Sequence, residues 1–218
     1  MADHYFSAEP SVASRRATVR LALADVDVEL LSDAGVFSAT RVDPGTIALL
    51  RESPQPPATG DLLDLGCGYG PIACALSLRS PRATVWAVDI NSRALALAAD
   101  NAKALGLKNL RAVSPTDVPD GTTFAGIWSN PPVRIGKNAL QELLSAWLGR
   151  LRPQCSAWLV VNRHLGGDSL AAWLGARGWD VRRAASKSGY RILEVRRQSD
   201  PGVAAGGALL AAPGGAGI

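Results

Sequence analysis

Two short stretches of the sequence combine residue types that can do chemistry. The first contains three glycines at alternate positions, Gly66, Gly68 and Gly70, directly after the apolar run at 61–65. Because glycine adopts backbone conformations that other residues avoid, such a loop can turn tightly and approach a ligand closely. A helix pattern opens at Pro71, and a helix N-terminus after a first strand is typical of a nucleotide-type cofactor site. An ordinary three-glycine turn is the alternative.

The spacing of these glycines narrows the ligand. Dinucleotide-binding loops follow the pattern GxGxxG, and this loop is one residue shorter, so it suits a ligand with a nucleoside but no pyrophosphate. Asp89 ends the next predicted strand, where its carboxylate can accept hydrogen bonds from ribose hydroxyls, or can instead cap the following helix. Asp117 follows the third strand and could accept from an adenine amine, or could belong only to a polar loop.

The second stretch is Ser129-Asn130-Pro131-Pro132, which follows another predicted strand. The two prolines fix the backbone and remove two donors, so the groups that remain are acceptors, namely the Asn130 amide oxygen and backbone carbonyls. Such a cluster suits a substrate that donates N–H groups, above all an aromatic exocyclic amine. Hydrogen bonds to that amine would localise its lone pair and aim it at a methyl donor. A strand-ending turn is the alternative for an isolated Asn-Pro-Pro.

The elements that must position these stretches alternate between strand and helix. We expect strands over 61–65, 83–88, 110–113, 124–128 and 156–162, helices over 71–79, 92–105, 138–151 and 168–176, and a last hairpin over 180–196. Repeated strand–helix units predict a doubly wound, mostly parallel α/β sheet with helices on both faces, and the hairpin adds antiparallel strands. Two alternating runs over 18–31 predict an N-terminal β-hairpin, and Asp43 with Pro44 begins a helix.

The chain divides into three predicted segments. Residues 1–60 form a preface packed on the main domain, residues 61–198 form the cofactor-binding domain, and the Gly/Ala-rich residues 199–218 form a disordered tail. The three cysteines make no CxxC pair, and no apolar run approaches the ~20 residues of a membrane span. With no signal peptide at the N-terminus, we expect a cytoplasmic protein that contacts no membrane. Neither histidine has a neighbour at ligand spacing, so we expect no metal.

The charge of the chain is mildly basic and unevenly placed. Lys and Arg total 23 against 19 Asp and Glu, a formal net charge of +4. Between residues 150 and 197, three acids oppose ten cations, which are Arg150, Arg152, Arg163, Arg177, Arg182, Arg183, Lys187, Arg191, Arg196 and Arg197. This excess indicates either a solvated basic face or a surface that contacts phosphate.

The two stretches together with Asp89 resemble the class I S-adenosylmethionine-dependent methyltransferases, which have a Rossmann-like sheet. More narrowly, the sequence is similar to the branch that methylates guanine N2 of 16S ribosomal RNA. The resemblance extends to His4–Ser7, Gly35–Ser38, Asp43–Thr46 and the end of the last hairpin, and so covers about residues 4–197. It implies S-adenosylmethionine as the cofactor, and ribosomal RNA or the small ribosomal subunit as the partner.

The resemblance also implies roles for single residues. Those around the methionine part of the cofactor are Asp64, Gly66, Gly68 and Gly70, while Asp89 binds the ribose and Asp117 the adenine. Asn130, Pro131 and Pro132 are the catalytic residues that hold the target amine, and Asn130 also borders the cofactor. The aromatic residue that often follows Asn-Pro-Pro is Val133 here. Further candidates for substrate contact are Phe37, Val133, Arg134 and Lys137, of which the two cations could face phosphate or only solvent.

Three other functions fit parts of the pattern. An enzyme of this type could methylate adenine N6 or a protein glutamine, since Asn-Pro-Pro occurs in amino-methylating enzymes of several kinds. A non-catalytic module that assists ribosome assembly would have no need for the acceptor at Asn130. A dehydrogenase is disfavoured because the pyrophosphate fingerprint is missing. The sequence leaves open the target nucleotide, the choice between naked RNA and an assembled particle, and the number of chains that associate.

Overall fold

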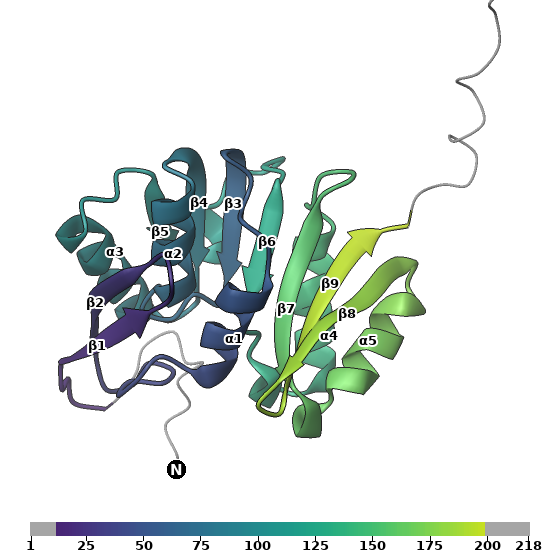
Figure 1. Ribbon diagram of the computed structural model, residues 1–218, viewed down its shortest axis with the longest axis horizontal. Coiled ribbons are helices and arrows are strands. Elements are labelled where there is room, and N and C mark those ends of the chain that lie inside the picture. Colours follow the sequence, from purple (N-terminus) through teal and green to yellow (C-terminus); the bar gives the residue numbers. More distant parts are fainter. Residues whose placement is uncertain (1–11, 199–218) are drawn as a thin grey trace, which may run out of the picture.

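The main sheet has seven strands, which the computed structural model describes within residues 12–198. Their bounds are β3 (Thr59–Leu65), β4 (Arg82–Val88), β5 (Leu110–Val113), β6 (Gly126–Ser129), β7 (Ser156–Asn162), β8 (Trp179–Lys187) and β9 (Tyr190–Arg197). They lie in the order β5-β4-β3-β6-β7-β9-β8 (Figure 1). Neighbours from β5 to β7 are parallel, whereas β9 is antiparallel to both β7 and β8. The predicted mostly parallel sheet with a C-terminal antiparallel hairpin is confirmed.

Five helices cover the two faces of this sheet. They are α1 (Pro44–Glu52), α2 (Pro71–Arg79), α3 (Ser92–Ala104), α4 (Lys137–Leu148) and α5 (Gly167–Gly175). Successive side chains of β3 point to opposite faces, so Leu62 packs in one core with α1, α2 and α3, while Leu63 and Leu65 pack in the other with α4 and α5. The carboxyl ends of the parallel strands β3 to β7 lie at one edge of the molecule, between the two layers of helices.

The N-terminal hairpin forms a separate two-stranded sheet of β1 (Ala17–Ala22) and β2 (Asp27–Ser32). Its Leu21 and Leu30 are fully buried in the core that contains α2 and α3. The side chain of Asn101 on α3 fixes the hairpin, since it accepts a hydrogen bond from Leu31 N at 2.6 Å and donates to Leu31 O at 2.9 Å. The predicted hairpin is therefore present and packs on the main domain, while the division of the chain at residue 60 stays a prediction.

Two predicted bounds differ from the observed ones around Phe124. The helix predicted over 138–151 ends at Leu148, and the strand predicted over 124–128 is β6, at 126–129. Both differences have one cause, because Phe124 N donates to Arg150 O at 2.8 Å and Arg152 N donates to Phe124 O at 2.9 Å. Residues 150–152 therefore form an extended bridge with Phe124 instead of a last helical turn.

Several predictions concern residues outside the described range. The predicted tail at 199–218 and the segment His4–Ser7 lie there. Within residues 12–198, no helix is long and apolar enough to cross a membrane. In the same range, no group of three or more His, Cys, Asp or Glu side chains is arranged to hold a metal ion.

Candidate active site

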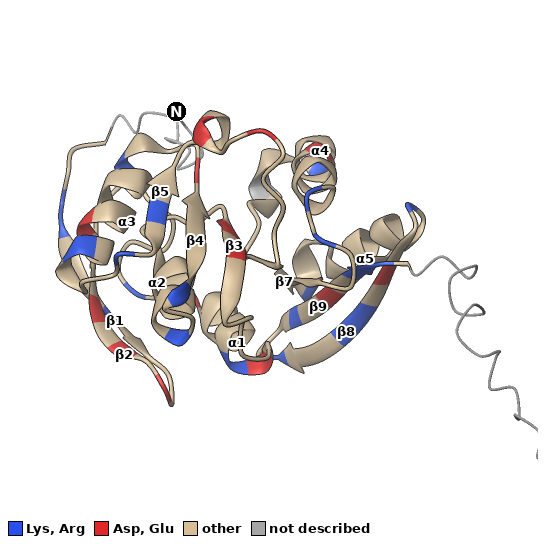
Figure 2. Ribbon diagram, turned by 90° about the horizontal axis from the view of Figure 1, so that it is seen from above, with Lys and Arg blue, Asp and Glu red and all other residues tan. Residues whose placement is uncertain are grey.

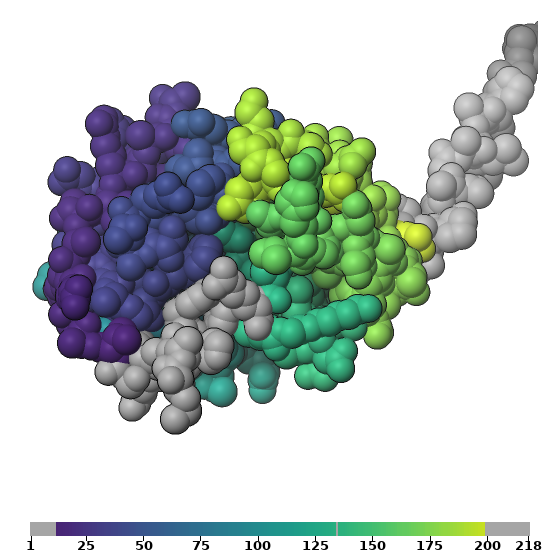
Figure 3. All heavy atoms as spheres, turned by 90° about the horizontal axis from the view of Figure 1, so that it is seen from below, coloured from purple at the N-terminus to yellow at the C-terminus, as the bar shows by residue number. Residues whose placement is uncertain are grey.

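The glycine loop and the Asn-Pro-Pro stretch begin side by side at the carboxyl edge of the sheet. Leu65 of β3 pairs with Ser129 of β6, and Ser129 Oγ donates a hydrogen bond to Leu65 O at 2.7 Å. The strand order reverses direction between β3 and β6, which is where open α/β sheets bind their ligands. A cavity of about 350 Å³ lies at this point, within the size range of small-molecule sites. Figure 3 views this edge, where the blue N-terminal segments face the green and yellow C-terminal hairpin.

The glycine loop forms one wall of the cavity and requires glycine at each of its three positions. The φ angles of Gly66, Gly68 and Gly70 are +74°, +55° and +89°, in the left-handed region that other residues rarely adopt. A Cβ atom added at Gly68 would meet no protein atom within 4 Å, although Gly68 lines the cavity. The backbone there is therefore open to a ligand, as a cofactor loop demands. At Gly66, an added Cβ would lie 3.8 Å from Pro132 Cδ, so this wall faces the Asn-Pro-Pro stretch.

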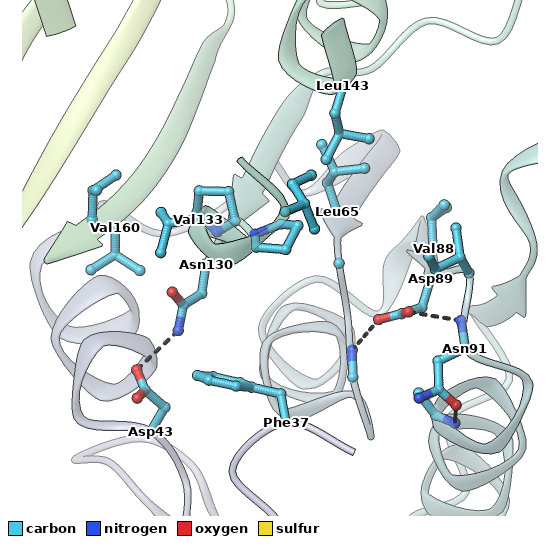
Figure 4. A pocket seen from close by; sticks show the side chains of 18 of the residues that line it. Phe37, Asp43, Leu65, Val88, Asp89, Asn91, Asn130, Val133, Leu143 and Val160 are labelled. Atoms are coloured by element: carbon cyan, nitrogen blue, oxygen red, sulfur yellow. Dashed lines mark hydrogen bonds between the residues drawn. The ribbon is translucent and has the colours of Figure 1, made fainter. Parts of the chain in front are cut away.

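Asp89 lies on the same wall and lines the cavity (Figure 4). Its Oδ2 accepts from Gly68 N at 2.9 Å and its Oδ1 accepts from Asn91 N at 3.0 Å, which fixes both oxygens. Desolvation raises the pKa of this carboxyl, although the two N–H groups oppose the rise. The cap of α3 is Asn91, whose side chain accepts from Arg93 N and Ala94 N, so Asp89 does not have that role. Its free lone pairs remain available to a ribose.

Asp64 and Gly70 stabilise the glycine loop on its side away from the cavity. Asp64 is fully buried and its Oδ2 accepts from Ala73 N, in the first turn of α2, at 2.9 Å. Burial raises the pKa of Asp64 to about 8, and the negative charge of Asp89 adds to the rise. Gly70 is the N-cap residue of α2. Neither residue lines the cavity, so their predicted contact with the methionine part of a cofactor stays a prediction.

Asn130 stands on the opposite wall and is held by the first turn of α1. Its Nδ2 donates to Asp43 Oδ2 at 2.9 Å (Figure 4) and also to Thr46 Oγ1 at 3.1 Å. A carboxylate can only accept, so the amino end of the amide faces Asp43 and the carbonyl Oδ1 is the end left for a substrate. The neighbouring residues Pro131, Pro132 and Val133 also line the cavity, and their predicted contact with an amine stays a prediction.

Apolar side chains supply the remaining surface of the cavity. Phe37, Ile90 and Leu165 are 39%, 51% and 54% exposed and all line it. Among residues 12–198, only Val12 and Leu78 are further large hydrophobic side chains with comparable exposure. Large apolar groups left open at one place indicate a ligand with flat, apolar faces, such as a nucleobase. Phe37, predicted from the sequence as a substrate contact, therefore lies where stacking on a base is possible.

Asp117 and Lys137 are two further predicted site residues that do not line the cavity. Asp117 is exposed in a 3-10 turn and its Oδ2 accepts from Ser114 Oγ at 2.6 Å, while Pro115 from the same turn lines the cavity. Lys137 is exposed at the start of α4 and is not part of the lining. The side chain of Arg134 lies outside the described part of the chain. The predicted roles of these residues in binding adenine and phosphate stay predictions.

Three polar residues of the Asn130 wall are not among the site residues predicted from the sequence. Asp43 was predicted to begin a helix, which it does by accepting from Gly45 N and Thr46 N, but its contact with Asn130 was not foreseen. Asn162 ends β7 and Tyr190 begins β9, and these two are directly paired across the sheet. Both line the cavity, so the last hairpin contributes to the site as well as to the sheet.

The described residues fit S-adenosylmethionine. The open backbone at Gly68 and the fixed carboxylate of Asp89 lie on one wall, and the exposed apolar groups can cover an adenine. The lining of the cavity extends from the glycine loop to residues of β7 and β9.

Comparison with known proteins decides the family. The model of the methyltransferase small domain matches residues 27–194. The chain belongs to the methyltransferase small domain family. The resemblance to methyltransferases drawn from the two stretches is thereby confirmed.

Relatives of two kinds are similar to this methyltransferase. The uncharacterized protein YbxB of Bacillus subtilis is 32% identical over 200 residues, which are 90% of this chain and 100% of YbxB. Ribosomal RNA small subunit methyltransferase C of Shewanella amazonensis is 30% identical over 184 residues, which are 82% of this chain and 52% of that protein. The corresponding protein of Hahella chejuensis is 35% identical over 176 residues, covering 78% and 50%. This methyltransferase thus spans about half the length of these ribosomal RNA methyltransferases.

A solved structure has the same fold. The T. thermophilus 16S rRNA N2 methyltransferase RsmC, in complex with AdoMet and guanosine, superposes with a TM-score of 0.71 at 23% sequence identity. The match covers 87% of this methyltransferase and 52% of that chain.

Proposed function

We propose that this chain transfers the methyl group of S-adenosylmethionine to an exocyclic base amine, guanine N2 of small-subunit ribosomal RNA. The observation that supports this most directly is the orientation of Asn130, whose amide oxygen is left for an N–H donor beside the glycine loop. The bound cofactor supplies an electrophilic methyl group on a positively charged sulfur.

The residues of the Asn130 wall would prepare the amine. An aromatic amine is a poor nucleophile because its lone pair is delocalised into the ring. An N–H group that donates to Asn130 Oδ1 pulls the amine out of conjugation and directs the lone pair toward the glycine-loop wall. This is catalysis by positioning and electrostatics, and it requires no strong base. When the new N–C bond forms and the S–C bond breaks, the amine gains a positive charge and its extra proton leaves to solvent.

Exposed cations near Tyr190 support an RNA substrate over a free base. Arg163 N donates to Gly189 O at 2.9 Å, which joins the end of β7 to the turn of the last hairpin. Lys187 pairs with Tyr190 across the hairpin, and the charge of Arg41 acts on the Tyr190 hydroxyl. All three cations are exposed beside a residue that lines the cavity, and Figure 2 shows further cations along β8 and β9. Such cations can bind the phosphates on either side of a target nucleotide.

The relatives support the same substrate. Proteins named ribosomal RNA small subunit methyltransferase C match across 72–82% of this chain at 30–35% identity. The fold match adds a 16S rRNA N2 methyltransferase that was solved with guanosine. Since this chain spans about half of those proteins, we propose that this half contains the complete methyl-transfer site.

The test is methyl transfer from labelled S-adenosylmethionine to purified small ribosomal subunits and to their naked RNA, followed by nucleoside mass spectrometry. We expect N2-methylguanosine, formed about 10³-fold more slowly by the Asn130→Ala protein. A product of N6-methyladenosine would overturn the choice of base, and transfer only to protein glutamine would overturn the choice of an RNA substrate. No transfer to any acceptor by a protein that binds the cofactor would instead support the assembly module. Analysis of ribosomal RNA from cells that lack the protein then identifies the nucleotide.

A further inference from the structure

The first turn of α1, Asp43-Pro44-Gly45-Thr46, makes more contacts with the site than the start of a helix needs. Asp43 Oδ2 accepts from Gly45 N at 2.8 Å and from Thr46 N at 3.1 Å, which completes the cap of the helix. The same oxygen then accepts from Asn130 Nδ2 at 2.9 Å, across 87 positions of sequence. Thr46, although buried, turns its hydroxyl to the same amide at 3.1 Å.

We propose that Asp43 is a positioning residue that sets which end of the Asn130 amide faces the target amine. This inference rests on the proposed function, because it concerns the amine that Asn130 holds. The two ends of an asparagine amide have nearly the same shape but opposite hydrogen-bonding properties. With the oxygen toward the cavity, Asn130 accepts from the amine. With the amide reversed, two N–H groups of Asn130 would oppose the N–H groups of the amine, and the lone pair would not be aimed.

Thr46 alone does not decide between these two orientations. A hydroxyl can either donate or accept, so Thr46 Oγ1 satisfies whichever end of the amide it meets. A carboxylate is acceptor-only, and Asp43 therefore makes the reversed amide unfavourable. Its negative charge also lies one hydrogen bond away from the group that receives the amine, where positive charge develops during methyl transfer.

Tyr190 packs against the first turn of α1 and holds it next to Asn130. A Cβ atom added at Gly45 would lie 2.6 Å from Tyr190 Cε1 and 2.8 Å from Asp43 Oδ2, so any side chain there would displace the ring or the carboxylate. Burial and the neighbouring Asp43 carboxylate raise the pKa of Tyr190. Gly45 thus permits a contact between α1 and β9 that holds Asp43 against Asn130.

A comparison of Asp, Asn and Ser at position 43 distinguishes the positioning of Asn130 from helix capping, because all three residue types cap helices well. Asp43→Ser keeps a capping oxygen but its side chain is too short to reach Asn130. Asp43→Asn keeps an oxygen that can accept from Gly45, Thr46 and Asn130, and replaces the other carboxylate oxygen with an uncharged NH2 group. We expect kcat to fall by about 10- to 100-fold in Asp43→Ser and to recover most of this loss in Asp43→Asn. The dissociation constant of S-adenosylmethionine, measured by titration, stays unchanged in both.

Equal activity in all three proteins would overturn the inference, since a residue that only caps α1 predicts that result. So would a loss that appears equally in both variants together with weaker cofactor binding. The Asn130→Ala background gives a second test. If Asp43 acts through Asn130, then Asp43→Ser lowers the residual rate of Asn130→Ala by less than twofold, whereas independent effects would multiply.

A readout without any substrate separates this inference from the proposed function. In protein labelled with 15N on asparagine side chains, the amide signal that disappears in Asn130→Ala belongs to Asn130. We expect that signal to shift and to exchange faster with solvent in Asp43→Ser, and to stay close to its native position in Asp43→Asn. A signal indifferent to both changes would overturn the positioning role even if the protein methylates guanine. Conversely, if the signal shifts as expected in a protein that methylates no RNA, the positioning of Asn130 by Asp43 stands and the proposed RNA substrate is rejected.

Discussion

The two walls of the cavity are built in opposite ways. The glycine-loop wall, made of Gly66, Gly68 and Asp89, comes from one strand–helix–strand unit and its bonds join neighbours in that unit. The Asn130 wall draws on segments that are far apart in the chain, since Asn130 contacts Asp43 and Tyr190 begins the last strand. One wall is thus specified locally and the other only by the finished fold. This difference suggests that a cofactor loop can be kept while the acceptor side changes with the substrate.

The largest expected effect comes from removing Asn130. Asn130→Ala deletes the only side-chain oxygen of the Asn-Pro-Pro stretch that an amine can meet, so we expect kcat to fall by about 10³-fold. The dissociation constant of the cofactor, measured by titration calorimetry, should change by less than threefold, because the glycine-loop wall is untouched. Equal losses in both measurements would show that the two walls are not separate. Retention of activity would show that Asn130 does not hold the amine.

Gly70→Ala is the matching change on the other wall. An added Cβ would lie 3.1 Å from Ala98 Cβ on α3, and the φ angle of +89° is unfavourable for alanine. We expect the free energy of unfolding to fall by about 2 kcal/mol, together with weaker cofactor binding. Gly106→Ala is the control, because Gly106 has a φ of +67° but an added Cβ meets nothing within 4 Å. Urea unfolding gives the loss of unfolding free energy in each variant. Because both variants have the backbone strain, the difference between the two losses is the effect of the contact with Ala98. Identical losses in the two proteins would mean that the close approach of α3 to the loop is unimportant.

Phe37→Ala tests whether a residue of the N-terminal segment 1–60 helps the Asn130 wall to hold the base. Val133 stands where an aromatic often follows Asn-Pro-Pro, and Phe37 is an exposed aromatic of the cavity lining. Loss of stacking on an aromatic is worth ~1–3 kcal/mol per base, so we expect KM for RNA to rise about tenfold with cofactor binding unchanged. Leu78→Ala is the control, because Leu78 is equally exposed at 39% but lies outside the cavity lining. A change in cofactor binding instead of KM would assign Phe37 to the other wall.

Asp64, beneath the glycine-loop wall, is expected to make stability depend on pH. Burial raises its pKa to about 8 in the folded protein, whereas an unfolded Asp titrates near ~3.9. Between these values the folded state holds one proton more than the unfolded state, so stability falls as pH rises through the window, by up to ~1.4 kcal/mol per pH unit. Asp64→Asn keeps an oxygen for Ala73 N and has no proton to lose. Urea midpoints measured at pH 5, 7 and 8.5 should therefore decrease less with pH in the variant than in the native protein. Parallel curves would contradict the protonated state.

Local patterns explain how far the sequence could predict the fold. The strand at 156–162 and the helix start at Pro71 follow from apolar runs and from proline at a first turn, and the structure has both at those residues. The end of α4 could not be predicted in this way. Leu151 continues the helical spacing, but it lies in the bridge that 150–152 form with Phe124, a contact across 27 positions of sequence.

The same limit applies to the candidate site. The glycine loop and Asp89 could be predicted because their spacing along the chain determines where they meet in space. Asp43 was visible only as a helix cap, since a carboxylate next to proline serves that role whether or not a distant amide is near it. Tyr190 had no distinguishing neighbours at all. Its place beside the cavity results from the antiparallel direction of β9, which no residue near it specifies.

The antiparallel direction of β9 affects when, during synthesis and folding, the cavity is completed. β9 is made after β8 yet lies between β7 and β8, so the final strand must insert between two strands that precede it (Figure 1). Because it runs against β7, its first residue, Tyr190, arrives at the cavity only when this insertion takes place. Chains emerge from their N-termini and such long-range pairing forms slowly. A chain still in synthesis therefore has the residues of its glycine loop but lacks a side of its acceptor site, and activity begins with completion of the sheet.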